Sequence, residues 1–143
     1  MRESEWTKRF IRKTNSLAQD MLEGKLSYIP DQQLFLYSTI IPPELKNMYL
    51  SGKDIILDES DNIYCFMMSQ YKDITGDDPP VNHGINKCWY DCLLKNTIGW
   101  SPKKVYAFAG LFKKGTSIDR QKRFKTIEEF LKNINFQAII SKK

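Results

Sequence analysis

The N-terminal segment carries the clearest helical pattern in the chain. Apolar residues recur every three or four positions from Trp6 through Phe10 and Leu17 to Met21, which places them on one face of an α-helix. Gly24 follows the last turn, where a glycine commonly ends a helix. We therefore predict a helix that packs this apolar stripe into the core.

The middle of the chain has a different pattern, which predicts β-strands. Three short runs rich in strand-forming residues stand at positions 33–41, 53–57 and 63–71. The polar stretch "DESDN" at 58–62 predicts the turn of a hairpin between the second and third runs. A short helix is expected at 43–50, because a proline opens that segment and a Ser-Gly pair follows it.

The second half mixes helical and strand-like segments. It predicts an exposed loop, a helix, a strand with a glycine bulge, a basic turn, a closing helix and a last short strand, at residues 72–84, 85–96, 103–112, 113–123, 124–135 and 136–140. Thr126 and Glu129 have the capping-box spacing at the start of the closing helix. Helices and strands do not alternate as crossovers, so we expect one α+β domain over residues 1–143, with helices packed on a mainly antiparallel sheet.

Composition fits a folded domain without a membrane span. The 143 residues are 41% hydrophobic and 13% aromatic, which is too apolar for a disordered chain. The N-terminus is charged where a signal peptide would be apolar, and no apolar run approaches the roughly 18 residues of a transmembrane helix. We expect a cytoplasmic protein that does not associate with membranes.

Charge is distributed unevenly along the chain. Residues 1–25, 26–80 and 81–143 carry net charges of +2, −6 and +9, which together make the net +5 of the whole chain. An acidic middle and a basic last third suggest two electrostatic faces suited to complementary docking. The residues expected to bind a partner are Asp58, Glu59, Asp61, Asp77, Asp78, Arg120, Lys122 and Arg123.

The stretch "HGINKCWYDC" is the best candidate for chemistry. It holds the only histidine, His83, together with Cys88 and Cys92. Zinc sites usually have four protein ligands, or three protein ligands and a water, and this stretch offers three candidates. Cys88 and Cys92 also share one face of the predicted helix with Trp89, which favours burial of both thiols. We therefore interpret the cysteines as buried structural residues and predict no metal, no cofactor and no catalytic residue. The paired aspartates at 77–78 are interpreted as a solvated turn.

Two segments resemble a known group of proteins. "IIPPELKNMYLSG" at 40–52 resembles the proline–helix–glycine entry of the SMI1/KNR4-like immunity superfamily, and "FKTIEEFLKNI" at 124–134 is similar to its closing helix. The chain as a whole also resembles bacterial immunity proteins of the polymorphic-toxin or contact-dependent-inhibition type. The resemblance implies a compact cytosolic α+β domain that binds and blocks one cognate toxin.

The leading interpretation is therefore a non-enzymatic binding module, an immunity protein that neutralises a bacterial toxin. A toxin that cleaves nucleic acid would be basic, and its inhibitor would contact it through the acidic middle. One alternative is a nucleic-acid-binding or regulatory domain that uses Arg120, Lys122, Arg123 and Lys125. Another alternative is a small enzyme centred on His83 and Cys88.

Overall fold

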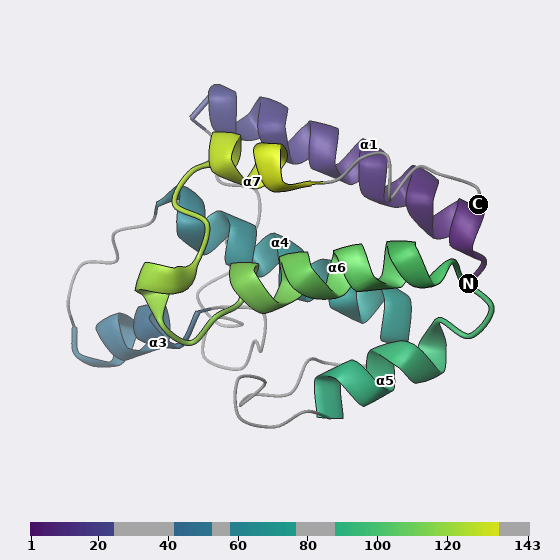
Figure 1. The fold of residues 1–143 in the computed structure, drawn as a ribbon. Helices are drawn as coiled ribbons and strands as arrows, with labels where there is room; N and C mark the ends of the chain where they lie inside the picture. The colour runs from purple at the N-terminus through teal and green to yellow at the C-terminus, as the bar shows by residue number, and fades with distance from the viewer. Residues whose placement is uncertain (25–41, 53–57, 77–87, 135–143) are drawn as a thin grey trace.

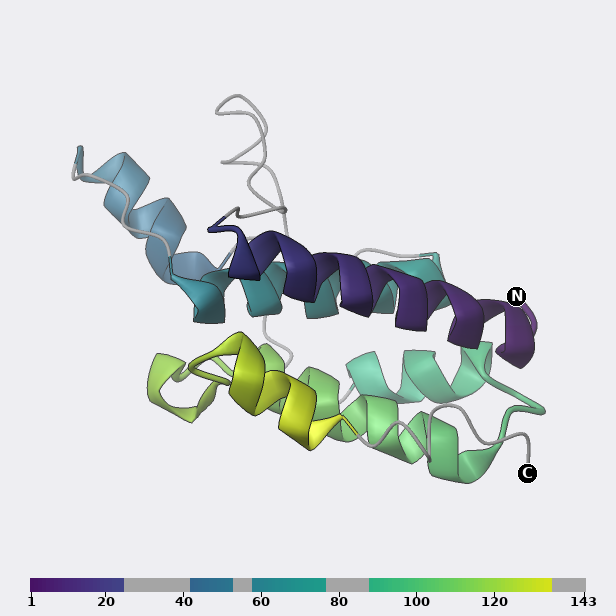
Figure 2. The same cartoon turned by 90° about the horizontal axis from the view of Figure 1, so that it is seen from above.

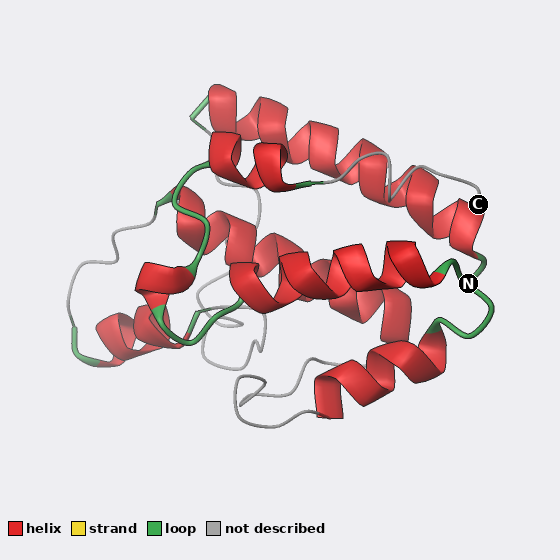
Figure 3. Ribbon diagram, in the orientation of Figure 1, coloured by secondary structure: helices red, strands yellow, loops and turns green. Residues whose placement is uncertain are grey.

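The described part of the chain is entirely helical. A computed structural model describes residues 1–24, 42–52, 58–76 and 88–134. Within these ranges it contains six α-helices and one 3-10 turn, and no strand (Figure 3). The expected α+β fold with an antiparallel sheet is therefore wrong for this part of the chain.

The helices form two layers around a central helix. They are α1 (Glu3–Leu22), α3 (Pro43–Leu50), α4 (Glu59–Thr75), α5 (Cys88–Asn96), α6 (Pro102–Gly115) and α7 (Ile127–Asn133), with the 3-10 turn η1 (Arg120–Lys122). Helices α1 and α4 make one layer, and α5, α6 and α7 make the other (Figures 1 and 2). Helix α4 contacts α1, α5, α6 and α7, so it is the element around which the rest pack.

Helix α1 confirms the N-terminal prediction. Trp6, Phe10 and Leu17 are buried along one face. The Trp6 ring stacks on Phe10 with centroids 5.0 Å apart and meets Phe108 of α6 edge-on at 5.5 Å. The chain leaves the helix at Gly24 with a φ of +76°, a left-handed conformation that glycine adopts at little cost.

Helix α4 replaces the predicted hairpin and strand. Asp58 is its N-cap, and Asp58 and Asp61 form a reciprocal capping box across the stretch that we read as a turn. The helix continues through the run predicted as a strand and through the start of the predicted loop, and ends at Gly76. A helix that is buried all round has no polar face, so its apolar run resembles that of a buried strand.

Helix α6 replaces the strand predicted at 103–112. Its buried residues Val105, Phe108, Ala109 and Phe112 have helical spacing, which the aromatic content and the glycine of the segment obscured. The helix also takes up residues 113–115 of the predicted basic turn, and the rest of that turn contains η1. Gly110, predicted as a strand bulge, is an ordinary helical residue.

The other helical predictions are confirmed. Helix α3 has the predicted bounds, and α5 covers the predicted helix from Cys88 onward. Thr126 caps α7, where its side chain accepts the Glu129 backbone N–H at 3.1 Å. The strands predicted at 33–41, 53–57 and 136–140 lie outside the described residues. No helix of the described part is both long and apolar enough to cross a membrane.

Candidate binding surface

Opposite charges from distant parts of the chain meet at the start of α4. The Arg120 guanidinium donates to Asp58 Oδ2 and, at 3.2 Å, to Asp61 Oδ2. Asp58 and Asp61 also bond each other's backbone N–H groups through the capping box, each at 3.0 Å. Arg120 therefore binds the cap of α4, and η1 is held against this end of the central helix.

Arg123, whose side chain is buried, makes a second set of contacts beside the first. Its two terminal nitrogens donate to the Glu44 carboxylate of α3, and its Nε donates to the Ser117 carbonyl at 2.6 Å. The guanidinium also lies over the Tyr64 ring, 4.6 Å from its centroid. Arg123 is only 1% exposed, so it joins α3 and α4 to the η1 segment from the interior. We name Glu44, Asp58, Asp61, Arg120 and Arg123 the acid–arginine cluster.

The cluster shifts the ionisation of its members. Burial raises the pKa of Asp61 to about 6, against the smaller effect of the hydrogen bond from the Asp58 backbone. Burial also opposes ionisation of Asp58, but hydrogen bonds from the Arg120 side chain and the Asp61 backbone together lower its pKa. The hydrogen bond to Asp58 raises the pKa of Arg120. Asp58 is thus ionised at neutral pH, where it accepts the hydrogen bond from Arg120.

The remaining predicted partner-binding residues have different positions. Glu59 Oε1 accepts the Ile127 backbone N–H at 3.1 Å, so it caps the start of α7. Lys122 is exposed on η1. Asp77, Asp78 and His83 lie outside the described residues. The fold therefore brings together Asp58, Glu59, Asp61, Arg120 and Arg123 as intramolecular contacts between helices.

The pairing extends to the other described acids of the middle segment. Asp73 of α4 lies 3.6 Å from Arg9 Nη1 and 3.8 Å from Lys13 Nζ of α1. Each described acidic residue between positions 26 and 80 thus contacts a cation or a helix N-terminus of the same chain. In the described part of the chain, the acids that were expected to form one electrostatic face make contacts within the fold, and the exposed charged residues of the second layer are mainly lysines.

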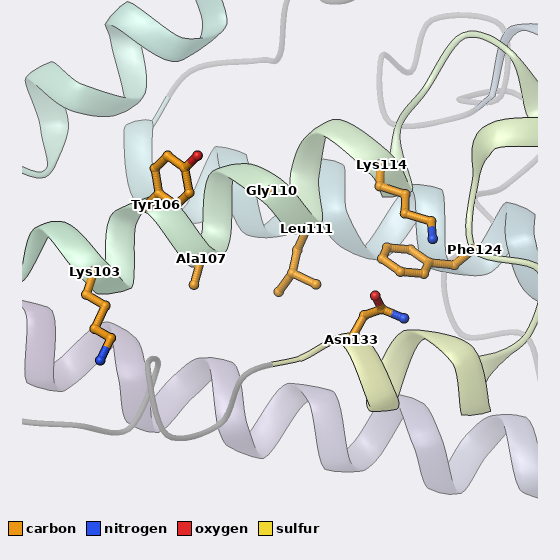
Figure 4. Close-up of a pocket in the computed structure, with 8 residues that line it drawn as sticks. All are labelled: Lys103, Tyr106, Ala107, Gly110, Leu111, Lys114, Phe124 and Asn133. Atoms are coloured by element: carbon orange, nitrogen blue, oxygen red, sulfur yellow. The ribbon is translucent and has the colours of Figure 1, made fainter.

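A groove lies along the exposed side of α6 (Figure 4). It has a volume of about 340 Å³ and is lined by Lys103, Tyr106, Ala107, Gly110, Leu111, Lys114, Phe124 and Asn133. Lys103 and Lys114 stand at opposite ends of the labelled α6 residues, with Ala107 and Leu111 between them. We name this feature the α6 groove. It combines an apolar floor with a cation at each end.

The side chains around the α6 groove differ in how they are held. Lys114 Nζ lies 4.7 Å from the centre of the Phe124 ring and 3.5 Å from Glu129 Oε1. Tyr106 is 76% exposed, which is unusual for an aromatic side chain and leaves one wall open. No acidic side chain of the described ranges pairs with Lys103. Within the described part of the chain, the groove thus offers one cation without an acidic partner, Lys103, and one weakly paired cation, Lys114.

The described residues do not gather the cysteines into a metal site, and two of the three cysteines depart from the predicted burial. Cys88 is exposed and Cys92 is half-buried, whereas Trp89 and Leu93 beside them are buried as expected. Cys65 is buried on α4, where burial raises the pKa of its thiol to about 12. The described residues contain no group of three side chains that could hold a metal ion.

Comparisons of this chain with protein-family models, with curated proteins and with solved structures found no match. The α6 groove was not among the sites expected from the sequence. Its signal was nevertheless present, since Lys103, Ala107, Gly110 and Lys114 recur at intervals of four, three and four residues. Reading residues 103–112 as a strand placed Lys103 and Ala107 on the opposite face from Gly110 and left Lys114 in the predicted turn, which concealed the stripe.

Proposed function

We propose that this chain is a non-enzymatic binding module that recognises an acidic protein partner through the α6 groove. In its most specific form it is an immunity protein that neutralises a cognate bacterial toxin in the cytoplasm. The observation that supports the proposal is an open groove with an apolar floor, an exposed tyrosine and a lysine at each end. Apolar centres with charged rims are typical of specific protein interfaces.

The location of the acidic residues favours this surface over the acidic middle. Asp58 and Asp61 are bound by Arg120, and Glu59 caps α7. A partner that took these carboxylates would have to break contacts that hold η1 and α7 against α4. At the α6 groove a partner would displace only the exposed ion pair of Lys114 with Glu129, so it can bind there without loss of the fold.

Gly110 independently supports a binding role for the α6 groove. A glycine inside an exposed helix costs about 1 kcal/mol relative to alanine. A Cβ built on Gly110 would meet no atom within 4 Å, so the fold itself does not require the glycine. Residues that lower stability without a structural reason are common where function needs space or a close approach. Here the missing side chain keeps the centre of the groove open.

Affinity capture with matched variants tests the proposal. The immobilised protein is compared with Lys103→Glu/Lys114→Glu, which changes both ends of the groove, and with Lys122→Glu/Lys125→Glu, which makes the same charge change elsewhere. Mass spectrometry identifies the proteins retained from a lysate of the source cells. We expect one protein that the wild type and the control retain and that the groove variant loses. Equal retention by all three forms contradicts the proposal.

Co-expression tests the immunity function. The captured partner should arrest growth when it is expressed alone, and growth should return when wild-type protein is produced with it. The groove variant should fail to restore growth although it accumulates to the same level. A partner that is harmless when expressed alone contradicts the immunity assignment but is consistent with a binding module of another kind.

A further inference from the structure

We infer that the α6 groove receives an amphipathic helix of the partner, with an acidic residue at each end of that helix's apolar face. The inference rests on the proposed function, and it specifies the secondary structure and the charge pattern of the bound segment. It follows from the direction, the length and the lining of the groove.

The groove runs parallel to α6. Six of its lining residues come from this helix, at positions 103, 106, 107, 110, 111 and 114, which together form one helical face. The eleven-residue step from Lys103 to Lys114 corresponds to about 16 Å, or three helical turns. A helix of about three to four turns lying along α6 would match this length.

The floor of the groove suits a second helix. Ala107 and Gly110 carry little or no side chain, and Gly110 has open space where a Cβ would stand. Small residues allow two helix axes to approach toward the short end of the usual range of about 8–10 Å. Leu111 lies beside them but is only 5% exposed, so apolar residues of the partner helix would pack mainly on Ala107 and over Gly110.

The ends of the groove determine the charge pattern of the partner. Lys103 and Lys114 are three turns apart, so carboxylates eleven positions apart on a parallel or antiparallel helix would reach both. Lys114 is already 3.5 Å from Glu129, which means that the partner must compete with an intramolecular carboxylate at that end. Removal of the Glu129 charge should therefore strengthen binding, which is an effect that general loss of stability cannot produce.

A nucleic acid fits this surface less well. Its backbone presents a phosphate charge about every 3.4 Å along each strand of a duplex, and proteins that bind it place cations at comparable intervals. Here the two cations are separated by an apolar floor about 16 Å long. The pattern of charged ends and an apolar centre is that of a helix-binding groove.

A synthetic probe tests the inference on the full-length protein. The probe is a stapled, fluorescent helix of about 18 residues with glutamates eleven positions apart and leucines between them on the same face. A control peptide has lysines in place of those glutamates. A single-stranded oligonucleotide of similar length is tested as a second kind of ligand. Fluorescence anisotropy gives the affinity, and backbone NMR shifts of labelled protein locate the contact.

We expect saturable binding of the acidic helix, with shifts concentrated at positions 103–114 and at Asn133. The control peptide with lysines should not bind. Lys103→Glu/Lys114→Glu should weaken binding at least about tenfold, while Lys122→Glu/Lys125→Glu should have a much smaller effect. Glu129→Gln should tighten binding, and Glu128→Gln, which removes the same charge one residue away, should leave it nearly unchanged.

Three results would overturn the inference. The first is shifts that lie outside the groove, and the second is tighter binding of the oligonucleotide at the same lysines. The third is no binding of the acidic helix. If the helix fails to bind while capture of a partner still depends on Lys103 and Lys114, the helical occupant is wrong and the proposed function stands. If capture does not depend on these lysines, the proposed function itself is wrong.

Discussion

Asp61 takes part in the capping box at the start of α4, and its burial opposes ionisation of its carboxyl group. Its carboxylate is 2% exposed, and Oδ2 accepts from the Asp58 backbone and from Arg120. Its Oδ1 is buried without a partner. The Oδ2 contacts favour the ionised form, whereas burial favours the protonated form and has the larger effect, so the pKa lies near 6.

This raised pKa gives Asp61 a definite pH signature. In the unfolded chain its pKa is about 3.9, so between that value and about 6 the folded state binds more protons. The contribution of Asp61 to stability therefore increases as pH falls through 6 and is smallest at neutral pH. Asp61→Asn keeps an acceptor for the cap and abolishes this titration.

We expect wild type to gain stability relative to Asp61→Asn on acidification from pH 7.5 to 4.5. The gain should be on the order of 1–3 kcal/mol, since one pKa unit corresponds to about 1.4 kcal/mol. Urea midpoints of both proteins at several pH values measure it. A difference that stays constant across the range, or that changes in the opposite direction, would contradict a raised pKa of Asp61 in the folded state.

Gly110 and Gly115 provide a matched pair of substitutions on α6. Gly110→Ala should stabilise the protein by about 0.5–1 kcal/mol, because the new methyl group meets open space and alanine favours helix. At Gly115 the Cβ would lie 3.0 Å from Met67 Cγ, so displacement of this buried side chain should cancel the gain. Chemical denaturation compares the two variants. Equal effects would mean that the two sites have similar surroundings.

At the scale of elements, the sequence revealed most helices with a polar face but misassigned α4, which has almost none, and α6, whose aromatic residues and glycine obscured its period. α1 and α7 alternate buried and exposed residues with helical spacing, and both were predicted. α4 buries nearly every position, including Ser60, Asn62 and Gln70, so its sequence shows no period to detect. Its capping box was visible at Asp58 and Asp61, but two aspartates in a polar stretch also suit a turn.

The contact between Glu44 and Arg123 holds α3 onto the bundle. Glu44→Gln leaves a buried guanidinium without its counter-charge and should cost about 3 kcal/mol. Arg123→Met should cost less in the Glu44→Gln background than in the wild type, because the contact is already lost there. We expect a coupling energy of about 1–3 kcal/mol from a double-mutant cycle of denaturation midpoints.

Additive effects of these two substitutions, within about 0.5 kcal/mol, would contradict this account. They would mean that Glu44 and Arg123 stabilise the fold independently. The Ser117 carbonyl and the Tyr64 ring would then be the important partners of Arg123.

At the scale of the whole molecule, oppositely charged segments of the sequence form ion pairs with each other that join parts of the fold. Three acidic residues of the middle segment and two arginines of the last third attract one another within one chain, and the fold brings them together near the start of α4. They are Glu44, Asp58, Asp61, Arg120 and Arg123. Linear charge segments do not reveal whether they pair with each other or with a partner. This is why the sequence suggested two docking faces where the described structure has a cluster and a surface of lysines.

The α6 groove could not be predicted from the sequence for a related reason. A groove depends on which helices lie side by side, and Phe124 and Asn133 reach the α6 groove only because α7 folds back beside α6. The stripe on α6 could be found from spacing once the segment was assigned as a helix. The contribution of α7 required the tertiary structure.

The most direct test measures binding and stability on the same two variants. Arg120→Glu places a negative charge against Asp58 and Asp61, and Lys103→Glu/Lys114→Glu reverses both ends of the α6 groove. The measurement is affinity for the captured partner per folded molecule, with a urea midpoint for each protein. Arg120→Glu should lose stability and keep its affinity, and the groove variant should keep its stability and lose its affinity. An Arg120→Glu protein that keeps its stability but no longer binds would contradict the account, because the acid–arginine cluster would then be the binding surface.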